Sequence, residues 1–378
     1  MKSFWLRLAV LTTLFWTCVL LTLQAYAGEV DQLTHRNQKI ADSTTLIDTE
    51  IKRLVTQSIN EANKEMKGFF SQTSCSSDET FEKARQIILT KLYNNLVTQN
   101  PIGVLESFAN KNASKKTTRL EDSIYASTPS SIVKKYGLSP VIQVGKTQIG
   151  TDKLGHFLNE GYTFFLNSKG QDDPLQRSKL VLTNSQNSEK EMYGSKTTQI
   201  KSYADMSANY EGFNFWKNMC LENFSQDEYG RRKQKKCSPE SFIQCQNGEW
   251  ALNPKHPVSI TEFVSSAWDE GINCSLYSTP EFTKSVYDEM NKRAGSFQGN
   301  PERPCPADIQ ECKNIQIKYS QYQLYDHLIS PVCLEVAKSR PQIFNERYLR
   351  YNSEEWDRRI DAKGKFKKQT PQTSSTKL

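Results

Sequence analysis

Apolar and polar positions alternate along this chain mainly with helical periodicity. Between residues 42 and 70, apolar side chains from Leu46 to Phe69 recur every three or four positions, which predicts one long amphipathic helix with a charged outer face. The same pattern predicts a second helix over residues 80–99, with Pro101 just beyond its end. Two such helices form an ordinary packing unit.

Short strand patterns interrupt the helices at two places. Two strands are predicted around the Gly145-Lys146 turn, and a second hairpin around Asn247-Gly248. Further helices are predicted over residues 174–192, from Ser202 onward, and near 259–270, 280–293 and 317–329. The predicted fold class is therefore mainly α, with a single helical core and two or three short β-hairpins.

The N-terminus has the three parts of a secretory signal peptide. Lys2 and Arg7 flank the start of an apolar run from Leu8 to Leu23, and Ala25-Tyr-Ala27 provides a cleavage site. Export to the periplasm or outside the cell is expected, with cleavage after Ala27. An uncleaved membrane anchor is the alternative, because the apolar run approaches the length of a spanning helix.

The rest of the chain divides into three predicted regions. Residues 28–135 form an N-terminal helical region and 136–335 a core that carries the motifs described below. Residues 336–378 form a C-terminal extension, which lacks an apolar stripe from about 361 and is expected to be largely disordered there.

Charge does not point to nucleic acid. Cleavage after Ala27 would remove Lys2 and Arg7, so 47 basic residues would face 42 acidic ones, for a net charge of +5. The basic residues cluster over 231–236 and 358–377, which are ordinarily solvated segments. Contact of the basic tail with anionic lipid headgroups or an envelope polymer is the sharper alternative.

Eight cysteines would remain after cleavage, and seven of them lie beyond residue 219. An even number in an exported chain favours disulfides, so the C-terminal half is predicted to be stapled. Cys237 with Cys245, and Cys305 with Cys312, are close enough in sequence to close short loops. The pairing itself stays open at this level.

Asp152, His156 and Glu160 are spaced four residues apart. On a helix they would share one face, with neighbouring Cβ atoms about 5–6 Å apart. Such a face suits acid/base chemistry or metal binding. The structural alternative is that Asp152 caps the helix, His156 is half-buried and hydrogen-bonded, and Glu160 points to solvent. Thr151 is the predicted N-cap residue.

Glu191 ends the helix predicted over 174–192 and precedes an extended polar segment. Hydrolases of the lysozyme type place their general acid in such a position, which makes Glu191 the candidate acid. A solvated glutamate at a helix end gives the same pattern.

Ser202 and Asp205 match a capping box at the start of a helix. Capping does not explain Asn209, one turn later, which lies in sequence between two tyrosines, Tyr203 and Tyr210. Amides and aromatic rings together suit a groove for carbohydrate or peptide, so these three residues are the predicted substrate contacts. A buried polar network between helices is the alternative.

Two segments carry a resemblance to a known group of proteins. Asp152-Lys-x-x-His156-Phe, followed by Ser202-x-x-Asp205-x-x-x-Asn209, resembles a largely uncharacterised group of exported Gram-negative proteins, and the first segment is similar to one in small predicted periplasmic lipoproteins. The resemblance covers roughly 70 residues. It implies an envelope location and one shared site, which includes Lys153, but it implies no reaction.

Three functions remain open from the sequence. The leading hypothesis is an exported cell-envelope hydrolase of lysozyme-like type, acting on peptidoglycan or a related glycan, with Glu191 as general acid and Asp205 as partner carboxylate. A non-catalytic, disulfide-stapled envelope protein is the second. The third is a metal hydrolase using Asp152, His156 and Asp205. No His-Glu-x-x-His helix occurs, so no cofactor and no metal ligand are assigned from sequence.

Overall fold

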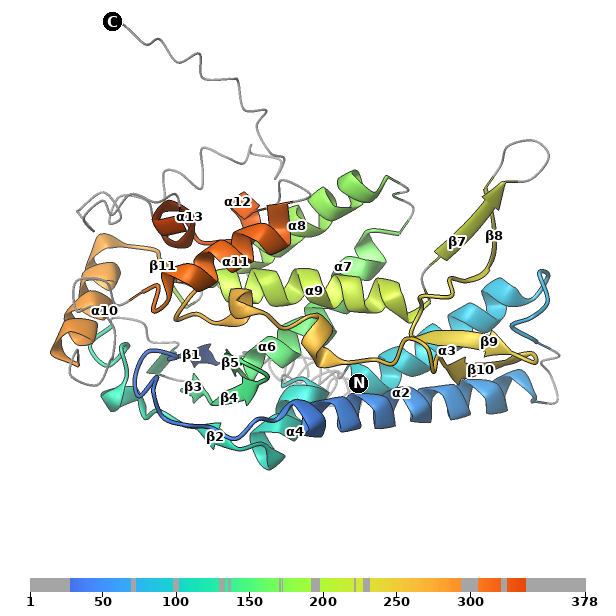
Figure 1. The fold of residues 1–378 in the computed structure, drawn as a ribbon, viewed down its shortest axis with the longest axis horizontal. Coiled ribbons are helices and arrows are strands. Elements are labelled where there is room, and N and C mark those ends of the chain that lie inside the picture. Colours follow the sequence, from blue (N-terminus) through green and yellow to red (C-terminus); the bar gives the residue numbers. More distant parts are fainter. Residues whose placement is uncertain are drawn as a thin grey trace, which may run out of the picture.

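A computed structural model describes most of the chain beyond the predicted signal peptide (Figure 1). Helices dominate and the strands are short, which confirms the predicted fold class. The predicted signal peptide and most of the C-terminal extension lie outside the described residues, which are 28–68, 73–97, 102–128, 133–134, 137–169, 171, 173–191, 198–220, 222–226, 232–293, 305–320 and 325–337.

The N-terminal helices form as their apolar stripes predict. Helix α2 (Thr44–Met66) and helix α3 (Phe81–Leu96) pack against each other, and each buries its stripe while its charged side stays in water. Figure 1 shows this pair along the lower right of the molecule, with the hairpin of β9 (Ile243–Gln246) and β10 (Glu249–Leu252) beside it. The predicted helical pair is confirmed.

A small three-stranded sheet leads into the motif. Strands β4 (Val141–Val144) and β5 (Thr147–Gly150) form the predicted hairpin, and Gly145 adopts a φ of +59° at its turn. Strand β2 (Lys115–Lys116) adds to the outer side of β4, which the sequence did not predict. The hairpin ends directly at the helix that carries Asp152.

That helix changes its winding partway along. Helix α6 (Asp152–Gly155) passes into a π-helical turn, η2 (His156–Glu160), and then into α7 (Gly161–Asn167). A π-turn closes its hydrogen bonds over five residues instead of four, and such turns are frequent at functional sites. Glu160 therefore follows His156 across a widened turn, and the simple four-residue row predicted from sequence does not extend to it.

Two long helices, α8 (Pro174–Glu191) and α9 (Tyr203–Met219), pack against each other near this segment. The capping box is confirmed, since the Ser202 side chain accepts a hydrogen bond from the Asp205 backbone N–H at 3.1 Å. Thr151 occupies the predicted N-cap position of α6, although its side chain makes no capping hydrogen bond.

Two predicted helices were misplaced. Residues 259–270 contain only two short 3₁₀ turns, η3 (Ile260–Glu262) and η4 (Ser266–Trp268), and the helix predicted over 317–329 corresponds to α11 and α12. The remaining elements are β1 (Glu29–Val30), α4 (Val104–Asn112), η1 (Leu120–Asp122), β3 (Leu138–Ser139), β6 (Ile200–Lys201), β7 (Glu222–Gln226), β8 (Arg232–Cys237), β11 (Leu276–Tyr277), α10 (Pro280–Lys292), α11 (Ile309–Tyr319), α12 (Tyr325–Leu328) and α13 (Pro331–Ala337).

Four disulfides staple the fold: Cys75–Cys245, Cys220–Cys237, Cys274–Cys305 and Cys312–Cys333. Neither short loop that the spacing allowed is closed by its own pair. Three bonds lie within the C-terminal half, while Cys75–Cys245 ties the N-terminal helical pair to the β9–β10 hairpin across 170 residues. Such bonds fit a protein that folds in an oxidising compartment.

Within the part of the chain that the structure describes, no helix combines the length and the apolar character needed to cross a bilayer.

Candidate functional site

The motif segment and α9 meet at two glycines. A Cβ built on Gly161 would lie 2.5 Å from the backbone of Gly212, and one built on Gly212 would collide with the Phe157 carbonyl oxygen. The indole Nε1 of Trp216 donates to the Leu158 carbonyl at 2.9 Å, within the π-turn. This close crossing explains the glycines and sets the motif residues against the first turns of α9.

His156 is held on both sides of its ring by α9. Asn209 Nδ2 donates to Ser185 Oγ at 3.1 Å, so in this amide orientation its oxygen faces the ring and His156 Nδ1 donates to it at 3.0 Å. Nε2 then faces Asp205 Oδ2 at 3.3 Å. A ring lone pair and a carboxylate oxygen repel at that distance unless a positive centre, a proton or a metal ion, lies between them.

Lys153 forms the centre of a buried ionic cluster. Its ammonium is fully buried and lies 2.7 Å from Asp152 Oδ2, 2.5 Å from Asp205 Oδ1 and 2.7 Å from Glu270 Oε1. Glu270 follows η4 and also accepts from the Ser202 hydroxyl at 2.9 Å. Three carboxylates around one ammonium leave an excess of negative charge in the protein interior.

The environment separates the pKa values of these carboxyl groups. Burial raises the pKa of Asp152 to about 7, although Lys153 acts in the opposite direction. Burial would also raise the pKa of Asp205, but His156 and Lys153 outweigh it and the pKa is lowered. For Glu270, burial prevails over Lys153 and the pKa is raised.

Asp152, His156 and Asp205 come together as a group. One donor atom from each lies within 4.8 Å of the donor atoms of the other two, which is a spacing compatible with a shared metal ion. Asp152 Oδ1 is buried and has no hydrogen-bond partner among the described residues. The structure thus unites three of the residues singled out from sequence, and Asn209 joins them through His156.

Glu189 on α8 enters this region. Glu189 is 1% exposed, its Oε1 has no hydrogen-bond partner in the described part of the chain, and its other contacts include the Ser202 backbone N–H. Burial, and then the charge of Asp205, raise its pKa well above the ordinary value. The Glu191 backbone ends α8, but its side chain lies outside the described residues, so its role as general acid stays a prediction.

The remaining predicted residues lie around the cluster. Glu160 ends the π-turn and is half-buried. Tyr203 accepts a hydrogen bond from Lys201 at 3.0 Å, while Tyr210 packs against the rings of Phe213 and Tyr319 in the core. Their contacts observed here are internal, so their roles in binding substrate stay predictions.

Glu106 on α4 contacts the motif segment at Gly155. Its Oε2 would lie 2.6 Å from a Cβ on Gly155, and burial together with the charge of Asp152 raises its pKa to about 7. The folded protein therefore holds a proton on Glu106 between pH 4.5, its ordinary pKa, and about 7, where the unfolded chain has released it. Stability falls over this interval as the pH rises.

Substitution of Glu106→Gln should remove this pH dependence. At pH 8 the variant is expected to be more stable than the wild type by up to about 3 kcal/mol, the equivalent of moving a pKa from 4.5 to about 7. At pH 4 the two proteins should be nearly equal. Urea unfolding at both pH values measures the difference, and an equal gain at pH 4 would contradict the titration of Glu106.

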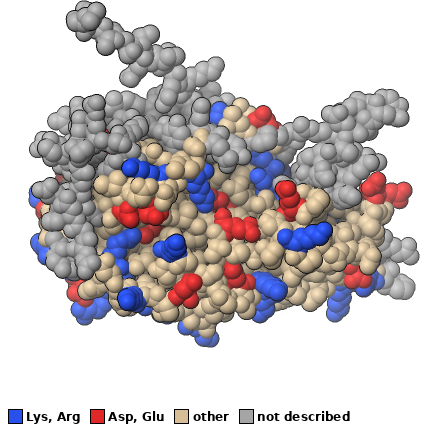
Figure 2. All heavy atoms as spheres, in the orientation of Figure 1, with Lys and Arg blue, Asp and Glu red and all other residues tan. Residues whose placement is uncertain are grey.

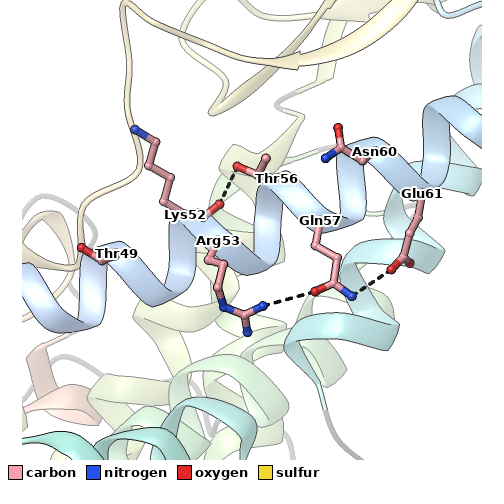
Figure 3. A pocket seen from close by; sticks show the side chains of 7 residues that line it. All are labelled: Thr49, Lys52, Arg53, Thr56, Gln57, Asn60 and Glu61. Atoms are coloured by element: carbon pink, nitrogen blue, oxygen red, sulfur yellow. Dashed lines mark hydrogen bonds between the residues drawn. The ribbon is translucent and has the colours of Figure 1, made fainter.

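The surface offers no comparable concentration of groups on the face shown in Figure 2, where basic and acidic side chains are interspersed. A shallow depression follows the outside of α2 (Figure 3), where Arg53 donates to Gln57 at 3.3 Å and Gln57 donates to Glu61 at 2.9 Å. All of its lining residues come from this one helix. The depression is therefore the outer, polar face of a single helix and not a cleft between elements.

Sequence reasoning missed Glu270 and gave Lys153 no role of its own. Lys153 belongs to the motif, but nothing in the surrounding sequence indicates that a lysine directly after Asp152 would be buried. Glu270 comes from a segment that was expected to be helical, 117 residues away from Lys153. Ser185 and Glu189 did carry a signal, because their four-residue spacing puts both on the side of α8 that faces α9.

Comparison of the chain with protein-family models, with curated proteins and with solved structures found no match. Its function therefore has to be inferred from the site itself.

Proposed function

We propose that the chain is an exported hydrolase of the cell envelope, with its reaction centre at Asp152, His156 and Asp205. The observation that carries the proposal is the placement of His156. Its ring is oriented by Asn209, and its other nitrogen lies 3.3 Å from a carboxylate, so the pair can share a proton or hold a cation that activates water. Among the described residues, buried oxygens of Asp152 and Glu189 have no hydrogen-bond partner, which also favours a functional centre, since purely structural networks are normally satisfied.

Peptidoglycan or a related glycan is the substrate class that the sequence suggests. Hydrolysis would give the hydroxyl of water to the anomeric carbon and its proton to the departing sugar oxygen. The export signal and the disulfides support an envelope location. We retain a glycan as the proposed substrate on those grounds.

Digestion of purified sacculi tests the proposal. The chain 28–378 should release soluble fragments from native or deacetylated sacculi, and His156→Gln and Asp205→Asn should each slow release by about 100-fold or more. His256→Gln is the matched control, because His256 pairs with Glu262 well away in sequence from the motif and is partly exposed. If neither native nor deacetylated sacculi release fragments, the protein does not hydrolyse these two substrates.

A non-catalytic envelope protein is the second candidate, and the burial of the centre favours it. His156 is 5% exposed and Asp205 is 8% exposed, so a bulky glycan would reach only the edge of the centre in this conformation. If the cluster serves only stability, the wild type should show no digestion of sacculi, and His156→Gln should only lower the melting temperature. A normal melting curve with lost digestion favours the hydrolase.

A further inference from the structure

We propose that the centre binds one divalent transition-metal ion through Asp152, His156 and Asp205. The three side chains come from two segments, the α6–η2 turn and the start of α9, and meet in the interior. The inference deepens the proposed function, since it rests on the same centre and names its cofactor. Metal binding can nevertheless be measured without any reaction.

The donor atoms have suitable spacing. Ligand atoms about 2.1 Å from a tetrahedral ion lie about 3.4 Å from one another. His156 Nε2 and Asp205 Oδ2 are already 3.3 Å apart, and all three residues offer donor atoms within 4.8 Å of each other. A shift of the Asp152 carboxylate toward the other two donors would complete the set.

The hydrogen bonds of His156 orient its imidazole as a metal ligand requires. A metal-bound histidine almost always donates its second ring N–H to a carbonyl or carboxylate oxygen, which fixes the tautomer and leaves the other nitrogen for the ion. His156 Nδ1 meets Asn209 Oδ1 in this way, and Ser185 in turn holds the Asn209 amide. Asn209 is thus a positioning residue for the proposed ligand.

Lys153 leaves one oxygen of each aspartate for the ion. It contacts Asp152 Oδ2 and Asp205 Oδ1, which leaves Asp205 Oδ2 facing His156 and Asp152 Oδ1 outside the contacts of the ammonium. Asp152 is only 2% exposed, and its Oδ1 lacks a hydrogen-bond partner among the described residues. A buried carboxylate oxygen without a partner is costly, and a bound cation would satisfy it.

The charges balance with a divalent ion. A bound cation would keep its carboxylate ligands ionised, so Asp152, Asp205 and an ionised Glu270 would then carry three negative charges against the one positive charge of the Lys153 ammonium. Two negative charges therefore remain for a divalent cation to neutralise. Because one ligand is an imidazole, the set suits Zn²⁺, Mn²⁺ or Fe²⁺ better than Ca²⁺ or Mg²⁺, which prefer oxygen ligands alone.

Metal analysis of the exported, untagged chain is the test. Protein purified without chelator, or dialysed against Zn²⁺, Mn²⁺ or Fe²⁺ and then against metal-free buffer, should retain about one equivalent of one ion per chain. Removal with a chelator should lower the melting temperature, and return of the ion should restore it. Co²⁺ should take the same place and report imidazole and carboxylate ligands in its visible spectrum.

Variants locate the ion. His156→Ala and Asp205→Asn should retain less than about a tenth of an equivalent, and Asn209→Ala should weaken binding by about 10-fold to 100-fold while the chain stays folded. His256→Ala and Asp288→Asn are the controls and should bind like the wild type, since both residues lie at the surface outside this cluster. Circular dichroism of each variant separates loss of metal from loss of fold.

The inference is overturned if the wild type binds none of the four ions, or if the His156 and Asp205 variants keep a full equivalent. Bound metal without digestion of sacculi would support the inference while removing the proposed substrate. Digestion by metal-free protein that takes up none of these ions would overturn the inference and leave the hydrolase in place.

Discussion

Lys153→Met should be among the most damaging single substitutions in this protein. The wild-type ammonium is fully buried and contacts Asp152, Asp205 and Glu270 at 2.5–2.7 Å. Methionine fills nearly the same volume but leaves the three carboxylates without their counter-charge. Breaking a buried ion pair in this way costs about 3–5 kcal/mol, so the free energy of unfolding should fall by at least that amount at neutral pH.

The loss should be smaller in acidic buffer, because the carboxyl groups can then take up protons in place of the missing ammonium. Lys284→Met is the matched control. That lysine forms an exposed pair with Asp288 one turn away on α10, and its loss should cost less than about 0.5 kcal/mol. Urea unfolding of both variants at neutral and acidic pH measures the effect. If Lys153→Met were as stable as the control at neutral pH, the cluster would not be ionised as described.

The elements that sequence predicted correctly are those determined by local interactions. Helices α2 and α3 follow from the spacing of their own apolar residues, and the turns at Gly145 and Asn247 follow from residues that tolerate a positive φ. The capping bond of Ser202 likewise joins residues only three positions apart. In each case, all the residues that determine the structure lie within one helix or one turn.

The helix predicted over residues 259–270 does not form, because local hydrogen bonds from side chains to the backbone compete with helical ones. The side chains of Ser259 and Ser265 each accept a hydrogen bond from a backbone N–H two residues later, and each begins a 3₁₀ turn that soon ends. Its apolar residues are buried all the same, so their spacing reflects contact with the core and not helical periodicity. Burial and helix formation give the same pattern over such a short stretch.

The candidate site was found in part, for a comparable reason. Asp152, His156 and Asp205 stood out because each belongs to a short motif, and the structure brings the three together, with Asn209 bonded to His156. Glu270 reaches the cluster only through tertiary folding, and no pattern in its own stretch of sequence predicts this contact. The long-range bond Cys75–Cys245 is hidden from sequence in the same way.

The helix crossing that assembles the site should depend on Gly212. Gly212→Ala would place a methyl group against the Phe157 carbonyl oxygen, a backbone atom that can move only if the π-turn and α9 separate. The gain in helix propensity, up to about 1 kcal/mol, is smaller than the cost of forcing the two backbones apart. We expect a net loss of about 3 kcal/mol, with weakened contact between His156 and Asn209 as a consequence.

Gly155→Ala is the matched comparison, because it has the same propensity gain but a different neighbour. The added methyl group would meet the end of the Glu106 side chain, which is buried but can shift more easily than a backbone atom. This variant should therefore stay within about 1 kcal/mol of the wild type. Thermal unfolding separates the two variants, and equal stabilities would mean that α9 and the π-turn do not approach as closely as the two glycines indicate. A destabilised Gly212→Ala that still orients His156 normally, judged by the NMR shifts of its ring, would instead show that the crossing supports the fold without setting the site.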